Sequence, residues 1–237
     1  VMICGPAGVP QGERSAVLDA TLAAGAKVAY LIDEPLAAAI GAKIPIAAAS
    51  GNMIMDIGGG SAEAAVISLG GVVAHKSVRI AGNKIDEAIA NFMKRKHNLL
   101  IGEVTSEEVK IKIGSATVLE SPEIMEVKGR DNVTGLPRAI PVSSTEVTEA
   151  IRPVLLQIIS AAKGVLEETP PELASDIIDK GIVMSGGTST LRNFDRFMTE
   201  LTGVPCHVAE EPLLCVVRGT GVAIENLDLY KRSIIKR

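Results

Sequence analysis

The chain contains an internal repeat, and this repeat limits the folds that it can adopt. The opening segment VMICGPAGVPQGERSAVLDATLAAGAKVAYLIDEPLAAAIGA and the later segment IVMSGGTSTLRNFDRFMTELTGVPCHVAEEPLLCVVRGTGVA have the same order of features. Each reads as an apolar strand, a glycine turn, a helix, a glycine before a short strand, and Glu-Pro-Leu opening a helix of small residues. The matched positions are Gly5 with Gly186, Gly25 with Gly203, and Glu34 with Glu211. The repeat predicts two similar α/β halves.

A run of three further strands separates the two repeats. Residues 53–57, 62–69 and 72–78 are strand-like and are joined by glycine turns, which predicts an antiparallel meander. The meander precedes the second repeat, whereas the first repeat begins at Val1. We therefore expect a counterpart meander upstream of Val1, and we expect the chain to be the later part of a longer protein.

The remaining periodicities predict mostly helices. Helices are expected at residues 12–25, 35–41, 84–96, 106–115 and 145–166, short strands at residues 2–4 and 27–32, and a hairpin within EIMEVKGRDNVTGLPRAIPVS. The sequence TSEE, at residues 105–108, is a helix-start signature and is expected to open the helix at 106–115.

Composition excludes several classes of protein. The chain has 237 residues, 47% of them hydrophobic, so it can bury a large core. Its net charge is −4, with acidic and basic residues interspersed. The sequence has no basic stripe of the kind that binds nucleic acid, so a nucleic-acid partner is not expected. No apolar run approaches the roughly 18 residues of a membrane span. The cysteines Cys4, Cys206 and Cys215 lie in apolar runs without a CxxC pair, which predicts buried thiols in a reducing, cytoplasmic compartment.

The stretch MDIGGGSAEAAV has the composition of a phosphate-binding turn. Three glycines between two strands can present backbone N–H groups to phosphate oxygens. Asp56 ends the first strand and is placed to hold Mg²⁺ through water, because that ion keeps its waters readily. Ser61 adds a hydroxyl at the same turn. The alternative is a plain hairpin whose glycines are needed only for positive φ.

A second glycine turn, in MSGGTSTL, supports the nucleotide interpretation. Gly186 and Gly187 follow a predicted strand and lead into a helix, which is a favourable place for the phosphate or ribose of a nucleotide. The two turns occupy comparable positions at strand ends, so we expect them to face one ligand.

The motifs together resemble one family. The segments LIDEPLAAAIGA, MDIGGGSAEAAVISLGG, LLIGEVTSEEVKIKIGSA, PPELASDI, GIVMSGGTSTLRNFD and AEEPLLCVVRGTGVA are similar, in order, to the signatures of the MreB family of bacterial actin-like rod-shape proteins. That family belongs to the actin, heat-shock chaperone and sugar-kinase superfamily. The resemblance covers nearly the whole chain and implies an actin-like ATPase fold of duplicated ribonuclease-H-like domains, truncated at the N-terminus.

The resemblance also implies a function and partners. It implies an ATP-binding cytoskeletal filament subunit that organises cell-wall synthesis and maintains rod shape, located as filaments at the cytoplasmic face of the inner membrane. The expected partners are further copies stacked head to tail, the cell-wall elongation machinery and inner-membrane shape proteins. Contact with the membrane surface is expected through parts that this chain lacks. The head-to-tail contact is expected between residues 83–146 of one copy and the region of PPELASDI and the tail of the next.

Site residues follow by resemblance, position by position. Glu34 matches the acid that orients the attacking water, and Ser61 matches a threonine that assists it. Asp56 is expected to hold Mg²⁺ through water, and the cofactor is ATP or ADP. The expected cofactor-binding residues are Asp56, Gly58, Gly59, Gly60, Ser61, Ser106, Glu107, Glu108, Val109, Lys110, Gly186, Gly187, Thr188 and Ser189.

The sequence departs from the family pattern at a few positions. Ser61 and Ala62 stand where the family usually has two threonines, Asn83 where it has aspartate, and Thr188 where it has a third glycine. The first phosphate loop and the membrane-contact loop of the family have no counterpart here. We therefore expect ATP to bind poorly and hydrolysis to be impaired in this chain.

The resemblance gives three expected subdomains. Residues 1–45 and 212–237 form the remnant of the first large subdomain, residues 46–82 and 147–211 the second, and residues 83–146 a small inserted one. The alternative functions are a sugar-kinase-like phosphotransferase and a chaperone-type ATPase domain. The first would need a sugar site and an acidic base, and the second a peptide-binding domain, none of which the sequence reveals.

Overall fold

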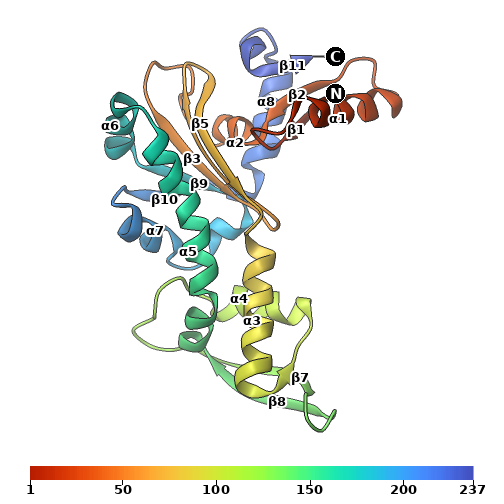
Figure 1. Ribbon diagram of the computed structural model, residues 1–237, viewed down its shortest axis with the longest axis vertical. Helices are drawn as coiled ribbons and strands as arrows, with labels where there is room; N and C mark the ends of the chain where they lie inside the picture. Colours follow the sequence, from red (N-terminus) through yellow and green to blue (C-terminus); the bar gives the residue numbers. More distant parts are fainter. Residues whose placement is uncertain (237) are drawn as a thin grey trace.

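The two repeats fold into equivalent units (Figure 1). The structure, a computed structural model, describes residues 1–236 apart from the side chain of Arg232. The first unit comprises β1 (Met2–Gly5), α1 (Gln11–Ala23), β2 (Tyr30–Asp33) and α2 (Glu34–Gly41). The second comprises β9 (Ile182–Ser185), η1 (Gly187–Thr190), α7 (Phe194–Thr202), β10 (Cys206–Val208), η2 (Pro212–Leu214) and α8 (Cys215–Glu225). In each unit the two strands pair in parallel, so the predicted repeat is confirmed in the topology.

The predicted meander forms three adjacent strands of a five-stranded sheet, from its central strand to one edge. β3 (Asn52–Ile57), β4 (Ala62–Ser68) and β5 (Gly71–Val78) pair antiparallel in sequence order. β9 pairs in parallel with β3, and the full order is β10-β9-β3-β4-β5. The sheet therefore joins the meander to the second repeat.

Helices cover both faces of this sheet. α5 (Ser144–Glu168), α6 (Pro171–Lys180) and α7 pack on one face, and α2 packs on the other. Alternate residues of β3 enter the two cores, with Met53 and Met55 in one and Ile54 in the other. Burial on both faces explains why the strand reads as a continuous apolar run.

A smaller part of the molecule lies at the N-terminal end of α5 (Figure 1). It contains α3 (Gly82–His97), β6 (Leu99–Leu100), α4 (Glu103–Ile113) and the antiparallel pair β7 (Ile124–Asp131) and β8 (Pro137–Ser143), which confirms the predicted hairpin. Ser143 begins α5 with a capping box: its side chain accepts from the Glu146 N–H, and the Glu146 carboxylate accepts from the Ser143 N–H.

The first repeat builds a three-stranded sheet with the order β1-β2-β11, where β11 is Ile234–Lys236 and follows η3 (Lys231–Ser233). α2 and α8, the helices that end the two repeats, cross at Gly41 and Gly219. A Cβ on Gly41 would lie 1.8 Å from the Cys215 carbonyl oxygen, and one on Gly219 would lie 1.7 Å from that of Ala37. Glycine is therefore required on both helices for this close approach.

Some expectations were wrong in detail. α4 begins at Glu103, so Ser106 lies within the helix instead of opening it, and its hydroxyl bonds back to the Gly102 carbonyl at 3.1 Å. β2 begins at Tyr30, three residues later than predicted. Cys4 is exposed, because it lies on a short edge strand, whereas Cys215 is buried as expected. The three-subdomain division stays a prediction, and its last residue, Arg237, lies outside the described residues.

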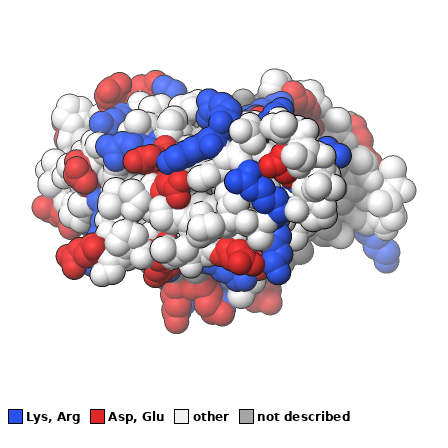
Figure 2. Space-filling view, turned by 90° about the horizontal axis from the view of Figure 1, so that it is seen from below, with Lys and Arg blue, Asp and Glu red and all other residues white. Residues whose placement is uncertain are grey.

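The surface of the smaller part carries charges of both signs. In the view from below, basic and acidic side chains are interspersed (Figure 2). Arg138 pairs with Asp131 at 2.9 Å within the β7–β8 hairpin, and Arg192, which lies between η1 and α7, pairs with Glu123 of the smaller part at 2.7 Å. Among the described residues, no helix is both long enough and apolar enough to cross a membrane.

Candidate functional site

A cavity of about 630 Å³ lies where the five-stranded sheet meets the smaller part. Its walls come from the β3–β4 turn, from η1 and from α4, which are far apart in the sequence. The lining residues are Gly58, Gly59, Gly82, Asn83, Glu107, Lys110, Ile111, Gly114, Gly187, Thr188, Thr190, Leu191, Arg192 and Leu213. The structure thus brings together parts of the two glycine turns and of the α4 segment.

Two carbonyl groups of the β3–β4 turn accept hydrogen bonds from the protein. The Gly58 carbonyl accepts from the Gly82 N–H at 3.2 Å and from the Thr188 hydroxyl at 2.8 Å, and the Gly59 carbonyl accepts from the Asn83 N–H at 2.8 Å. Among the hydrogen bonds of the described residues, the N–H groups of Gly59 and Gly60 have no protein acceptor. Free N–H groups on a turn suit an anion.

The plain-hairpin alternative does not account for these glycines. None of Gly58, Gly59 and Gly60 is among the glycines with positive φ. A Cβ on Gly59 would come within 3.0 Å of the Asn83 side-chain oxygen, whereas one on Gly60 would meet no atom within 4 Å. Space for a close ligand therefore explains Gly60 better than backbone conformation does.

The second glycine turn is fixed against the first. Gly186 has φ of 83°, and a Cβ there would lie 2.3 Å from the Ile57 carbonyl oxygen, so only glycine fits. Thr188, which replaces the third glycine of the family pattern, donates the hydroxyl bond to Gly58 described above. Ser189 is buried, and its hydroxyl donates to the Gly186 carbonyl at 2.6 Å, so it stabilises the turn from behind.

The α4 residues divide between the cavity and other surroundings. Glu107 and Lys110 line the cavity, and the Lys110 ammonium lies 2.9 Å from Asp86. Ser106 and Val109 are buried in the core. Glu108 points to solvent and pairs with Lys112 at 2.5 Å. The expected five-residue contact thus has two side chains at the cavity.

Asp56, which is buried, and Glu34, which is half-buried, lie in an acidic region outside the lining of this cavity. Asp56 is 6% exposed and accepts a 2.6 Å bond from the Ser185 hydroxyl. Burial raises the pKa of Asp56, and the Ser185 bond opposes this effect. Glu34 opens α2, and burial, then the charges of Asp56 and Glu63, raise its pKa to about 7. Within the described residues, no group of three or more His, Cys, Asp or Glu is placed to hold a metal ion directly.

Several residues at the site were not singled out from the sequence. Arg192 lines the cavity and is held by Glu123, but no motif distinguishes it from other surface arginines. Asn83 was noted only as a departure from the family pattern. Glu63 is 3% exposed and pairs across the strands with Asp56. The sequence does distinguish Glu63, because it is an acid within the otherwise apolar run of β4.

Comparison with known sequences gives consistent relatives. A family model described as MreB/Mbl protein matches residues 1–232. The cell shape-determining protein MreB of Escherichia coli (strain K12) is 49% identical over 230 residues, covering 97% of this chain and 66% of that protein. The cell shape-determining protein Mbl of Bacillus cereus is 46% identical over 235 residues, covering 99% of this chain and 71% of that protein. The chain thus spans just under two thirds of the length of the Escherichia coli relative.

Solved structures confirm the predicted actin-like α/β fold. MreB5 of Spiroplasma citri, in a crystal structure bound to ADP, matches with a TM-score of 0.93 and 34% identity, over 98% of this chain and 70% of that one. A second structure of that protein, bound to AMPPNP, matches equally well. The MamK double helical filament matches with a TM-score of 0.78 over 94% of this chain and 68% of that one; at 21% identity it bears on the fold alone.

Proposed function

Because the chain belongs to the MreB/Mbl family, we propose that it is a nucleotide-binding subunit of actin-like filaments that organise cell-wall synthesis and maintain rod shape. The observation that carries the proposal is the cavity enclosed by the β3–β4 turn, η1 and α4. The MreB5 relative, bound to ADP in one crystal structure and to AMPPNP in another, supports a nucleotide as its ligand.

ATP or ADP is the proposed ligand, with its phosphates at the β3–β4 turn. The free N–H groups of Gly59 and Gly60 are suited to phosphate oxygens, because they donate hydrogen bonds without a side chain in the way. The nucleoside is proposed to lie between α4 and η1, near Glu107, Lys110 and Gly187. The aliphatic side chains of Ile111 and Leu213 offer apolar surface to the base.

The acidic region fits a hydrated Mg²⁺ ion. Glu34, Asp56 and Glu63 lie within electrostatic range of one another, and burial is the leading cause of the raised pKa of each. A nearby divalent cation would favour their ionised forms. Contact with Mg²⁺ is proposed through water at Asp56, because that ion keeps its waters readily. When bound, Mg²⁺ supplies neutralisation of phosphate charge.

Glu34 and Ser61 are the proposed catalytic residues for ATP hydrolysis. The Glu34 carboxylate, with a pKa of about 7, can accept a hydrogen bond from water at neutral pH. Ser61 ends the phosphate turn and offers a hydroxyl to the same water. Phosphoryl transfer to water depends on positioning and charge stabilisation and needs no covalent intermediate.

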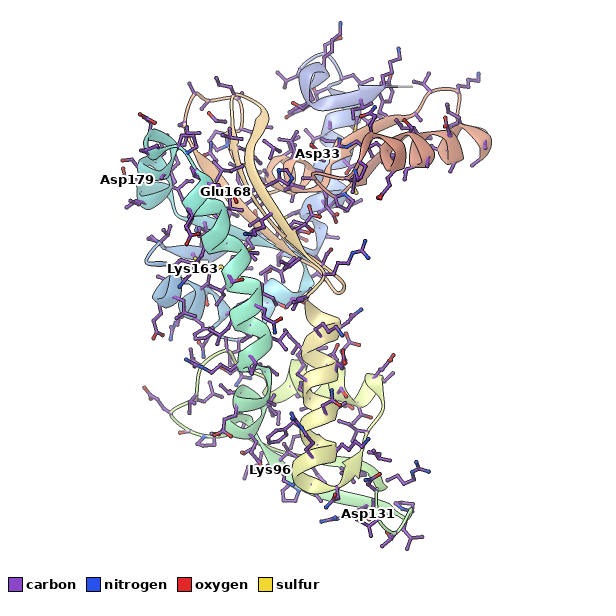
Figure 3. All side chains as sticks on the ribbon, viewed as in Figure 1. Asp33, Lys96, Asp131, Lys163, Glu168 and Asp179 are labelled. Atoms are coloured by element: carbon purple, nitrogen blue, oxygen red, sulfur yellow. The ribbon has the colours of Figure 1, made fainter. Side chains whose placement is uncertain are left out.

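Calorimetry on the 237-residue chain tests the nucleotide proposal. We expect Mg²⁺-dependent binding of ADP, with the Mg²⁺ dependence lost in Asp56→Ala. Asp179→Ala, on the exterior of α6 at the far end of the molecule, is the matched control and should bind as the parent does (Figure 3). Binding of equal strength with and without Mg²⁺ would contradict the role of Asp56, and absence of any binding would contradict the nucleotide proposal.

Head-to-tail assembly is proposed along the long axis of the molecule. Glu168 and Asp179 lie toward one end of this axis and Lys96 and Asp131 lie at the other (Figure 3). The end with α6 and the tail is proposed to contact the smaller part of the next copy, a heterologous contact that produces filaments. The elongation machinery, inner-membrane shape proteins and the inner face of the membrane are the proposed surroundings. Light scattering and electron microscopy with ATP and Mg²⁺ test assembly, and a strictly monomeric protein at high concentration would contradict it.

A further inference from the structure

Glu63 is a buried carboxylate of the acidic region to which the proposed chemistry assigns no contact with water, nucleotide or Mg²⁺. It lies on β4 and is 3% exposed. One carboxylate oxygen accepts a 3.3 Å bond from the Ala7 N–H, and the other accepts a 3.2 Å bond from the Ser77 hydroxyl. Ala7 belongs to the β1–α1 turn of the first repeat, whereas Ser77 belongs to β5. Glu63 therefore joins the two sheets.

The β1–α1 turn sits directly on the five-stranded sheet. A Cβ on Gly8, whose φ is 78°, would lie 2.3 Å from Nε2 of His75 on β5, so glycine permits this contact. A charged group is costly to bury, and such groups persist where they are hydrogen-bonded. Glu63 is hydrogen-bonded in this way by Ala7 and Ser77, and these two bonds hold the β1–α1 turn against β4 and β5.

The same turn is linked to Glu34. Gly5 at the end of β1 is the parallel partner of Asp33 at the end of β2, and Asp33 immediately precedes Glu34. Arg14 of α1 donates to the Val9 carbonyl at 3.3 Å and pairs with Asp33 at 2.7 Å. Asp33 lies where the first sheet faces the five-stranded sheet (Figure 3). The turn, Arg14 and the start of α2 thus form one connected unit.

We propose that Glu63 is a positioning residue, which anchors this unit to β4 and thereby sets the place of Glu34 relative to the Asp56 end of β3. Asp56 is the cross-strand partner of Glu63, so the strand pair that carries the anchor also carries the proposed Mg²⁺ contact. Loss of the anchor leaves the β3–β4 ladder intact but frees the turn and the start of α2. The catalytic part of this inference rests on the proposed function of Glu34.

Hydrogen exchange on the 237-residue chain tests the anchor without any ligand. In Glu63→Ala we expect the segment 6–14 and the start of α2 to exchange about tenfold faster, because a buried hydrogen bond is lost, while segment 53–60 is unchanged. Glu63→Gln should restore protection, since its amide oxygen can accept from Ala7 and its amide group can donate to Ser77. Ser77→Ala, which leaves the Ala7 bond in place, is the matched control. Unchanged exchange of segment 6–14 in Glu63→Ala would overturn the inference, as would a uniform increase across β3, β4 and β5.

Phosphate release supplies the second measurement. Glu63→Ala should lower kcat with little change in KM, because a misplaced Glu34 affects the transition state more than nucleotide binding. If Glu63→Ala fails to fold, Arg14→Leu breaks the next link of the same unit and should have the same effect on kcat. A raised KM with kcat unchanged would overturn the positioning role. If the parent chain releases no phosphate, the hydrolysis part of the proposed function fails, and hydrogen exchange still decides whether Glu63 is the anchor.

Discussion

Gly219→Ala is expected to disrupt the crossing of α2 and α8. The added Cβ would lie 1.7 Å from the Ala37 carbonyl oxygen and 2.9 Å from the Gly41 nitrogen, and both are backbone atoms that cannot rotate away. The helices would have to separate by roughly 2 Å to restore ordinary contact. Every residue of α2 from Pro35 to Gly41 is buried, so the separation loosens a packed core.

The expected cost can be worked from two opposing effects. Overpacking a core costs about 1–3 kcal/mol, and the backbone contact places Gly219→Ala at about 3 kcal/mol. Alanine is the better helix former by about 1 kcal/mol, so the net loss is about 2 kcal/mol. Gly221→Ala is the matched control on the same helix, because its Cβ would meet nothing within 4 Å. It should gain up to about 1 kcal/mol.

Thermal and urea unfolding followed by circular dichroism measure this difference. The two variants should differ by about 3 kcal/mol, which for a chain of this size separates their midpoints by roughly 6–12 °C. Gly219→Ala should unfold at the lower temperature and Gly221→Ala at or above that of the parent chain. Equal midpoints for the two variants would refute the packing argument, because both exchange glycine for alanine in one helix.

Three further predictions concern charge, the second turn and a helix cap. Burial raises the pKa of Glu34 from 4.5 to about 7, so its contribution to stability is present below pH 4.5 and is lost as the pH rises through 7. In urea unfolding without divalent cations, the stability of Glu34→Gln relative to the parent chain should therefore rise by about 1 kcal/mol between pH 4 and pH 8. This value is discounted for the partial exposure of Glu34. Gly186→Ala should lower the unfolding midpoint more than Gly203→Ala, since both have positive φ but only the first Cβ meets backbone, at 2.3 Å; equal shifts would contradict this. Ser143→Ala should cost about 1 kcal/mol in urea unfolding because α5 loses its capping box, and an unchanged midpoint would show that the cap contributes nothing.

Much of the fold could be predicted because local patterns agree with the tertiary structure. The antiparallel meander follows from alternating apolar runs joined by glycine turns, and its three strands appear with the predicted order. The repeat predicts two similar α/β halves, and each half contains two parallel strands, the pairing that a strand, a helix and a second strand in succession favour. The long helix at residues 144–168 was expected almost to its ends, since its apolar periodicity is strong.

The parts that could not be predicted depend on contacts between distant segments. TSEE has the sequence of a helix start, but α4 begins two residues before Thr105, and Ser106 bonds within the helix. Asp56 and Gly58 are neighbours in one motif, yet the cavity is lined by Gly58 and the Asp56 side chain lies in the acidic region. β3 ends at Ile57, so Asp56 lies within the strand and Gly58 lies in the turn that reaches the cavity, and one motif supplies two environments. Sequence spacing alone does not assign a face to either residue.

The repeat also explains how the β3–β4 turn is held. Ala7 lies two residues after Gly5, and Thr188 lies two residues after Gly186, so they occupy equivalent positions in the two repeats. Each donates one hydrogen bond to the β3–β4 hairpin: the Ala7 N–H to the Glu63 carboxylate, and the Thr188 hydroxyl to the Gly58 carbonyl. Both repeats therefore hold the hairpin through the equivalent position. The acceptor is the Glu63 carboxylate on the side of the first repeat and the Gly58 carbonyl on the side of the second. The Ala7 bond is 3.3 Å long and the Thr188 bond is 2.8 Å long, so the second repeat holds the hairpin through the shorter bond, and a movement between the repeats should break the Ala7 bond first.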